Sequence, residues 1–281
     1  DSSGNAWVTI YANGSGNSVN EYSGVDGTNP TTVTFNESAV GPNSIAIDSS
    51  GNLYTANDNN TVTKITGGAE NGTPFSGGGL ASPTGVAIDT TGNVWVSNGG
   101  SGGSLTRFNN TGVTSANFPG GGIATAYALA MDGSGHVWVA DHSGELSGLF
   151  VADGSDVSGT PFNYGGFGGQ GTEFTIAVDG DGNVWTQNFS NPFQNVIEFD
   201  PNLSGGTFLS PPPANNDSNN PYPGYQASGT LSFPSAAAID SSGNVWVANN
   251  GSDSLTKIVG AGAPTITPLV SQLPNHFGSR P

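Results

Sequence analysis

Cysteine is absent from the 281 residues, and lysine and arginine together contribute only four. The absence of cysteine excludes disulfides, thiolate zinc sites and a cysteine nucleophile. The sequence also has no apolar run long enough to cross a membrane and no secretory signal peptide. We therefore expect no membrane insertion, and we interpret the chain as the mature or trimmed form of a secreted protein.

The scarcity of positive charge leaves a formal net charge of −17 at pH 7. A field of that sign repels nucleic acids and anionic membrane surfaces, so neither is expected as a partner. Very low lysine content together with abundant Asn, Thr and Gly is typical of bacterial surface proteins. We therefore predict an extracellular or cell-surface location.

The sequence contains an internal repeat with a period of about 40–60 residues. Each copy begins with an aspartate, and a glycine follows three positions later. Six positions after the aspartate stands a large aromatic residue, and this position uses all five tryptophans of the chain. The aspartates are Asp1, Asp48, Asp89, Asp132, Asp179 and Asp240, and the aromatic residues are Trp7, Tyr54, Trp95, Trp138, Trp185 and Trp246.

Within one copy, the pattern predicts a β-hairpin followed by two further strands. Gly85–Asp89 and Val94–Asn98 are short and rich in β-branched residues, as strands are. The D-x-x-G-N segment between them is typical of a tight turn, since Asp bonds its own backbone and Gly and Asn tolerate positive φ. Ser104–Phe108 is the predicted third strand, and Val113–Phe118 is a weaker fourth strand.

Four short strands in each period predict an all-β fold, a six-bladed β-propeller of four-stranded antiparallel blades. The recurring aromatic residue is then interpreted as a packing residue between neighbouring blades. We predict one domain over 1–281. Its blades span approximately 1–40, 41–80, 81–122, 123–170, 171–232 and 233–281.

Two runs, GVAIDTTGNVWVSN and AAAIDSSGNVWVANNGSDSLTKI, resemble NHL-type repeats. They are similar in particular to those of bacterial propellers of the streptogramin (virginiamycin B) lyase-like type. The resemblance extends over nearly the whole chain in six copies. It implies a propeller fold, and it leaves the function open between lyases, hydrolases and secreted binding modules.

One position in the predicted third strand holds three of the four cationic residues of the chain. Lys64, Arg107 and Lys257 occupy it in three copies, while Glu21 and Glu198 occupy it in two others. A solvated strand face with cross-strand pairing explains these residues without a binding site.

The first copy is predicted to lack its inner strand, because Asp1 corresponds to the last residue of that strand. The chain therefore has six second strands and five inner strands. Three explanations are open: residues upstream of Asp1 supply the strand, the C-terminal tail fills the slot, or a neighbouring molecule donates a strand. The third explanation predicts self-association through the open first blade.

Two long connections are predicted to lie on one face of the propeller, at 163–174 and 203–233. Loops of this length are usually functional or disordered. Packing over the blade ends is the favoured interpretation of their aromatic residues. If the protein binds a protein or glycan ligand, these aromatic residues and one histidine from a neighbouring loop are the candidate binding residues. These residues are Tyr164, Phe167, Tyr222, Tyr225 and His142.

The resemblance to streptogramin lyases implies a base and a metal-assisted acid, with His and Glu close together. The three histidines, His136, His142 and His276, form no H-x-H or E-x-H pair, and we assign no catalytic residue. We therefore predict a binding or structural module, possibly a subunit of an extracellular assembly. A metal-dependent enzyme of the lyase-like or lactonase-like propeller type is the alternative.

The run from Asp179 to Asn183 resembles the first half of a calcium loop, D-x-D-G-N. The closing glutamate of such a loop is missing, and the repeat already accounts for every residue except Asp181. Turn chemistry is therefore the favoured interpretation, and no cofactor is expected. Calcium or magnesium at Asp179 and Asp181 is the alternative.

Overall fold

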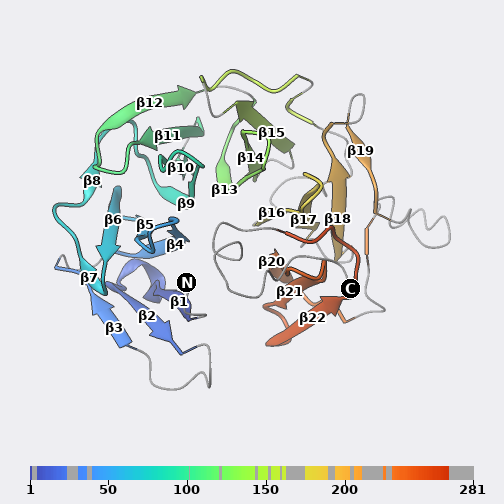
Figure 1. Cartoon of the computed structure of the whole chain (residues 1–281), viewed down its shortest axis with the longest axis horizontal. Helices are drawn as coiled ribbons and strands as arrows, with labels where there is room; N and C mark the ends of the chain where they lie inside the picture. Colours follow the sequence, from blue (N-terminus) through green and yellow to red (C-terminus); the bar gives the residue numbers. More distant parts are fainter. Residues whose placement is uncertain are drawn as a thin grey trace. The chain divides into compact units, whose positions relative to one another are not determined.

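The protein is described by a computed structural model, in which the strands of Figure 1 are labelled in chain order. Apart from one 3-10 turn, η1 (Ala12–Gly14), the secondary structure of the described residues is entirely β. None of these residues forms a helix with the length and apolar character needed to span a bilayer. The described residues are 1, 5–23, 31–36, 40–100, 102–119, 122–142, 145–150, 153–158, 160–162, 175–188, 194–202, 206–210, 224–225 and 230–265.

The chain divides into two compact units, and the first is built mainly from Asp1–Gly120. It contains three antiparallel sheets, called sheets 1 to 3. Sheet 1 consists of β1 (Ala6–Ile10), β2 (Ser18–Tyr22) and β3 (Thr31–Thr34). Sheet 2 consists of β4 (Pro42–Ile47), β5 (Leu53–Asn57), β6 (Thr61–Thr66), β7 (Ala69–Glu70) and β8 (Phe75–Ser76). Sheet 3 consists of β9 (Pro83–Ile88), β10 (Val94–Asn98), β11 (Ser104–Phe108) and β12 (Thr114–Pro119).

The second unit, built mainly from Gly121–Ser271, contains sheets 4 to 6. Sheet 4 consists of β13 (Ala126–Met131), β14 (His136–Asp141) and β15 (Glu145–Phe150). Sheet 5 consists of β16 (Ile176–Val178), β17 (Val184–Asn188), β18 (Asn195–Asp200) and β19 (Thr207–Phe208). Sheet 6 consists of β20 (Pro234–Ile239), β21 (Val245–Asn249) and β22 (Ser254–Ile258).

Each sheet has two chemically different faces, because successive side chains of a strand point to opposite sides. The aromatic face carries the repeated Trp or Tyr of the second strand. The aliphatic face carries the residues on either side of it, such as Val94 and Val96 in β10, which flank Trp95. These two names are used below for every sheet.

Within each unit, the aromatic face of one sheet packs on the aliphatic face of the next. In the first unit, Tyr54 and Val62 of sheet 2 share a core with Val94 and Val96 of sheet 3. Sheets 1 and 2 form an equivalent core. Sheets 4 and 5, and then sheets 5 and 6, repeat the same arrangement in the second unit. The repeat in the sequence is thus a repeat of one packing interface.

The first strand of the chain lies at a sheet edge. β1 pairs with β2 alone, and sheet 1 has the order β1-β2-β3. In sheets 2 to 6 the equivalent strand, the one that carries the repeated aromatic residue, is paired on both sides. Sheet 1 therefore lacks an inner strand among the described residues, as the sequence predicts.

The predicted strands of the third copy agree closely with the structure. Val94–Asn98 and Ser104–Phe108 are observed as β10 and β11 with unchanged bounds, and the fourth strand is shifted by one residue to Thr114–Pro119. The fourth strand predicted for the last copy, 264–270, lies largely outside the described residues. The number of blades and the single domain over 1–281 stay predictions.

Candidate functional site

The turn aspartate of each copy binds the aromatic residue six positions later. In sheet 3, Asp89 Oδ1 accepts from the backbone N–H of Thr91 and Asn93, and Oδ2 accepts from Asn93 Nδ2 and, at 2.9 Å, from Trp95 Nε1. A buried indole N–H needs an acceptor, and the carboxylate supplies it. The same bond joins Asp1 to Trp7, Asp48 to Tyr54, Asp132 to Trp138, Asp179 to Trp185 and Asp240 to Trp246.

These hydrogen bonds determine the ionisation of the turn aspartates. Burial alone would raise the pKa of Asp89, but the hydrogen bonds from Thr91, Trp95 and Asn93 outweigh it and lower the pKa below its usual value. The pKa of Asp132 is lowered in the same way by His136 and Trp138. The carboxylates of Asp89 and Asp132 are therefore anionic acceptors. The sequence pattern alone did not reveal the bond to the aromatic residue.

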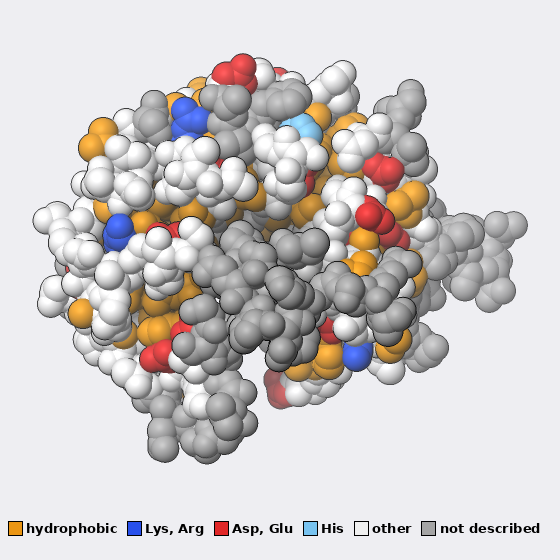
Figure 2. Space-filling model, viewed as in Figure 1, with side chains coloured by type: hydrophobic (Ala, Val, Ile, Leu, Met, Phe, Trp, Pro, Cys, Tyr) orange, Lys and Arg blue, Asp and Glu red, His pale blue; other side chains and the backbone are white. Residues whose placement is uncertain are grey.

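The third-strand position beside the aromatic residue differs between sheets. Lys64 lies over the Tyr54 ring in sheet 2, with Nζ 5.5 Å from the ring centroid. Arg107 lies 5.2 Å over Trp95 in sheet 3, and Lys257 lies 5.0 Å over Trp246 in sheet 6. These are cation–π contacts. Figure 2 shows how few Lys and Arg side chains reach the face in view.

In sheet 5 the same position holds a buried carboxylate. Glu198 is only 7% exposed, so the predicted solvated strand face is wrong for this residue. Its Oε2 accepts from Tyr225 Oη at 3.1 Å, and its Oε1 accepts from Asn183 Nδ2 at 3.4 Å. Burial raises the pKa of Glu198 to about 7; the Tyr225 bond opposes the rise, and the charges of Asp179 and Asp181 add to it.

Tyr225 occupies a position of the repeat that the sequence pattern did not reveal. Its backbone forms a bridge with Val196 through bonds of 2.8 and 3.0 Å in both directions. Its ring stacks on Trp185 with a centroid distance of 5.6 Å. In sheet 3, Phe118 pairs with the equivalent residue, Leu105, and stacks on Trp95. Tyr225 therefore takes the place of a fourth-strand aromatic residue.

The Glu198 site is enclosed by further buried polar groups. Burial raises the pKa of Tyr225 to about 12, with the adjacent Glu198 charge contributing, so the phenol stays a donor. Gln187 of β17 lies on the same face as Trp185 and is fully buried, and neither polar atom of its amide has a hydrogen-bond partner among the described residues. The aromatic face of sheet 5 thus carries two buried polar side chains, Glu198 and Gln187.

His142 lies apart from this site, in a sheet 4 loop. Its ring stacks on Tyr127 at a centroid distance of 5.3 Å, and its backbone N–H donates to Thr125 O. The neighbouring Asp141 is fully buried and accepts from the backbone N–H of Ala124 and Thr125. Asp141 therefore closes the loop.

The structure places the two residues predicted as an alternative metal site in different environments. The Asp179 carboxylate accepts five N–H groups, from Asp181 N, both nitrogens of Asn183, Trp185 Nε1 and Ala263 N. Asp181 is exposed. No group of three metal-ligating side chains occurs among the described residues. A calcium or magnesium site at these positions stays a prediction.

Of the five predicted binding residues, three lie outside the described residues: Tyr164, Phe167 and Tyr222. The other two, Tyr225 and His142, belong to sheets 5 and 4 and are not brought together by any described contact.

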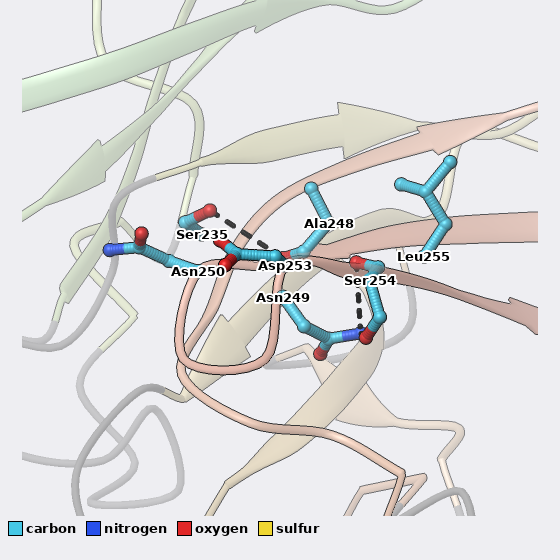
Figure 3. A pocket seen from close by; sticks show the side chains of 7 residues that line it. All are labelled: Ser235, Ala248, Asn249, Asn250, Asp253, Ser254 and Leu255. Atoms are coloured by element: carbon cyan, nitrogen blue, oxygen red, sulfur yellow. Dashed lines mark hydrogen bonds between the residues drawn. The ribbon is translucent and has the colours of Figure 1, made fainter.

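A shallow pocket lies on sheet 6, with a volume of about 330 Å³. Figure 3 shows its lining side chains, which come from the strands and from the β21–β22 turn. Asn249 Nδ2 donates to Ser254, so part of this polar rim is committed to the turn itself. The lining residues are Ser235, Ala248, Asn249, Asn250, Asp253, Ser254 and Leu255.

No family model and no curated protein sequence matches the chain. Its structure is similar to virginiamycin B lyase from Staphylococcus aureus, with a TM-score of 0.65 and 13% identity over 95% of this chain and 87% of that one. It is also similar to the WD40 β-propeller domain of Doa1, with a TM-score of 0.62 and 12% identity over 86% and 71%. A protein of unknown function from Bacteroides caccae gives a TM-score of 0.61 and 15% identity over 92% of both chains.

These likenesses confirm the predicted fold class and the resemblance stated from the sequence. The chain is an all-β propeller whose fold is similar to that of the streptogramin B lyases. At identities of 11–15%, the comparisons establish the fold and carry no activity across.

Proposed function

We propose that this propeller is a binding module that takes up an extended polypeptide segment at the edge of β1. The observation that carries the proposal is that β1 pairs on one side only among the described residues, whereas the equivalent strands of sheets 2 to 6 are paired on both sides. An open edge presents a row of backbone donors and acceptors that another strand can satisfy. The module would then act in an extracellular or cell-surface assembly.

The hydrogen bonds between Asp1 and Asn5, which precede β1, support this proposal. The Asp1 amino group donates to Asn5 O at 2.8 Å, as the Asp89 amide donates to Asn93 O in sheet 3. Asp1 also accepts from Trp7 Nε1. The position of an inner strand is thus set up by the same contacts that position it in the other sheets.

The chain itself supplies the probe for this edge. A peptide of the sequence SAAAID, which is residues 235–240, is the inner-strand segment of sheet 6. We expect it to bind the protein saturably in a fluorescence anisotropy titration. The matched control is the same peptide with N-methylated backbone amides, which keeps the side chains and loses the donors; equal binding of both peptides, or of neither, would reject strand uptake.

An enzyme is the second candidate function, and the likeness to lyase propellers favours it. Glu198 is the described carboxyl group with the pKa best suited to proton transfer near neutral pH. One related structure is a lyase bound to quinupristin, so the test is incubation with quinupristin and Mg²⁺ followed by mass spectrometry. We expect the compound to stay intact; its chemical conversion would favour the enzyme.

The ligand class and the location of the protein are proposals as well. A polypeptide is favoured over a glycan because the β1 edge offers backbone groups, and a glycan array tests the alternative. Fractionation of the native cells, with detection of the chain in the medium or at the surface, tests the proposed location.

A further inference from the structure

The chain contains four Asn–Gly pairs, each with chemistry of its own. The backbone nitrogen of the glycine can attack the side-chain carbonyl carbon of the asparagine before it. Glycine favours this attack, because it has no side chain to obstruct it and its backbone rotates freely. The four pairs are Asn13–Gly14, Asn71–Gly72, Asn98–Gly99 and Asn250–Gly251.

In three of these pairs the glycine N–H is held by a backbone hydrogen bond. The three bonds join Gly14 N to Tyr11 O at 3.0 Å, Gly99 N to Ser82 O at 2.9 Å, and Gly251 N to Ser232 O at 3.0 Å. A nitrogen held in this way must break its bond before it can turn toward the side chain. These three pairs therefore react only after a local opening of the fold.

The fourth pair, Asn71–Gly72, is different. The Gly72 N–H has no hydrogen-bond partner among the described residues, and both residues of the pair are exposed. Gly72 has a φ of 78°, and a Cβ added to it would meet no atom within 4 Å. The Asn71 side chain is held by one bond at the surface, from Nδ2 to Thr66 Oγ1 at 3.1 Å. The Gly72 nitrogen can therefore reach the Asn71 side chain without any opening of the fold.

The outer strand of sheet 2 explains why this nitrogen is unbonded. In sheet 3 the outer strand β12 is continuous and pairs with β11. In sheet 2 the outer strand is divided into β7 and β8, which pair with different parts of β6 (Figure 1). Asn71 N still donates to Lys64 O at 2.8 Å, and the ladder resumes only at Phe75. The break between β7 and β8 releases the Gly72 N–H.

We propose that Asn71 is a site of spontaneous chemical modification, at which its amide becomes a carboxylate through a cyclic imide. The Gly72 nitrogen bonds to Asn71 Cγ and loses its proton, and Nδ2 takes up a proton and leaves as ammonia. A water molecule from the solvent then opens the ring at either of its two C–N bonds. One cleavage leaves aspartate, and the other leaves isoaspartate, in which the main chain runs through the side-chain carbon.

The modification changes charge and chain length at one place. Both products add a negative charge to a chain whose formal net charge is already −17. Isoaspartate also lengthens the backbone, directly after β7. The bond from Asn71 N to Lys64 O lies before the altered atoms, so the β6–β7 hairpin is retained and the change falls in the connection to β8. The modified protein is therefore expected to stay folded.

Peptide mapping by mass spectrometry, after prolonged incubation of the folded protein, tests the proposal. In water labelled with heavy oxygen, the Asn71 peptide should lose ammonia and gain one labelled oxygen. Isoaspartate should accompany aspartate, because the cyclic imide yields both, and methylation by an isoaspartyl methyltransferase detects it. The conversion should be faster at pH 8 than at pH 6, since the attacking nitrogen must lose its proton.

Asn250–Gly251 is the matched control within the chain. The Asn250 side chain makes no hydrogen bond among the described residues, so the bond that holds the Gly251 N–H is the main difference between the pairs. In the folded protein, Asn71 should convert at least about tenfold faster than Asn250. In urea, where the fold holds no backbone N–H, the two rates should agree within about twofold.

Gly72→Ala is the matched variant. Its methyl group stands beside the attacking nitrogen, so conversion at Asn71 should slow in the folded and the unfolded chain, while conversion at Asn250 stays unchanged. Circular dichroism verifies that the variant folds. If it does not, the comparison of folded and urea-unfolded wild type still decides the question.

Three outcomes would overturn the proposal. Equal rates at Asn71 and Asn250 in the folded protein would show that the glycine hydrogen bond gives no protection. Conversion at Asn71 in urea but not in the folded protein would show that the fold holds the Gly72 nitrogen. Aspartate without isoaspartate would show that water attacks the amide directly and that no ring forms.

Discussion

Sheets 3 and 5 share one hairpin design and carry opposite charges at its centre. In both, a turn aspartate accepts from the tryptophan indole, and a fourth-strand aromatic ring stacks on that tryptophan. In sheet 3 the ring is Phe118 and the neighbouring charge is Arg107. In sheet 5 the ring is Tyr225 and the neighbouring charge is Glu198.

The difference shows how the repeat accommodates a charged residue of either sign. A guanidinium is attracted to the faces of the two rings in sheet 3 and needs no hydroxyl there. A carboxylate is repelled by ring faces, so it needs a donor, and the hydroxyl of Tyr225 supplies it. The pairs Phe–Arg and Tyr–Glu are therefore two solutions to one packing problem, and the second one leaves a titratable group in the interior.

The largest expected effect on stability comes from the aspartate–indole hydrogen bond that both sheets share. Asp89→Ala and Asp179→Ala each leave a buried indole N–H without its acceptor, and each should lower the free energy of unfolding by about 3–5 kcal/mol in urea titrations. The two variants should differ in pH dependence. Removing Asp179 also removes a negative charge near Glu198, so its cost should be smaller above pH 7 than at pH 5.

For Asp89→Ala, the cost should be the same at both pH values, because sheet 3 has no acid of raised pKa beside Trp95. Equal pH profiles for the two variants would contradict the electrostatic coupling of Asp179 and Glu198. A cost below about 1 kcal/mol for both would contradict the structural role of the aspartate–indole bond.

The second largest expected effect is the dependence of stability on pH that Glu198 causes. Its pKa is about 7 in the folded state, against an ordinary value of 4.5. Between these values the folded chain holds a proton that the unfolded chain has released, so the contribution of Glu198 to stability falls as pH rises from about 4.5 to 7. Glu198→Gln should remove that slope and be more stable than the wild type at pH 8 by about 2–3 kcal/mol.

Tyr225→Phe is the matched variant for this measurement. It keeps the ring stacked on Trp185 and removes the donor to the ionised carboxylate, so it should raise the Glu198 pKa further and extend the fall in stability to higher pH. NMR titration of the Glu198 side chain checks the pKa directly. A folded-state pKa near 4.5 would remove the basis of both expectations.

The sequence was sufficient for the hairpins because their determinants are local. D-x-x-G-N fixes the turn through bonds that span four residues, from Asp89 to Asn93, and Gly92 takes the positive φ of 85° that the turn needs. The β-branched segments on each side then pair in the only register that this turn allows. The strands β10 and β11 were accordingly predicted with their observed bounds.

The site in sheet 5 was missed in the sequence, because its determinants are distant in the chain. Glu198 and Tyr225 are separated by 27 residues, and the connection between them carries no repeat signal. Tyr225 was accordingly interpreted as an aromatic residue outside the repeat, whereas it fills the position of Phe118. A register search for an aromatic residue opposite the second residue of each third strand would have found it.

The smallest expected effect tests whether the two pairs are exchangeable. Arg107→Glu places a carboxylate over Trp95 and near the anionic Asp89, with no donor to satisfy it, and should cost about 2 kcal/mol at pH 8. Adding Phe118→Tyr reproduces the pair of sheet 5, because Phe118 stacks on Trp95 as Tyr225 stacks on Trp185. The double variant should regain about 1 kcal/mol of that loss.

The coupling between the two substitutions is the decisive quantity, and a double-mutant cycle measures it. Phe118→Tyr alone should leave the free energy of unfolding nearly unchanged. The new hydroxyl lies beside Arg107, whose guanidinium has no acceptor to which the hydroxyl could donate a hydrogen bond. If the carboxylate and the phenol bond each other, the recovery should be larger at pH 8 than at pH 5, where a protonated glutamate gains less from the donor. A recovery that is absent, or the same at both pH values, would mean that Tyr225 and Glu198 depend on the particular backbone of sheet 5 and that the hairpin design does not by itself determine the pair.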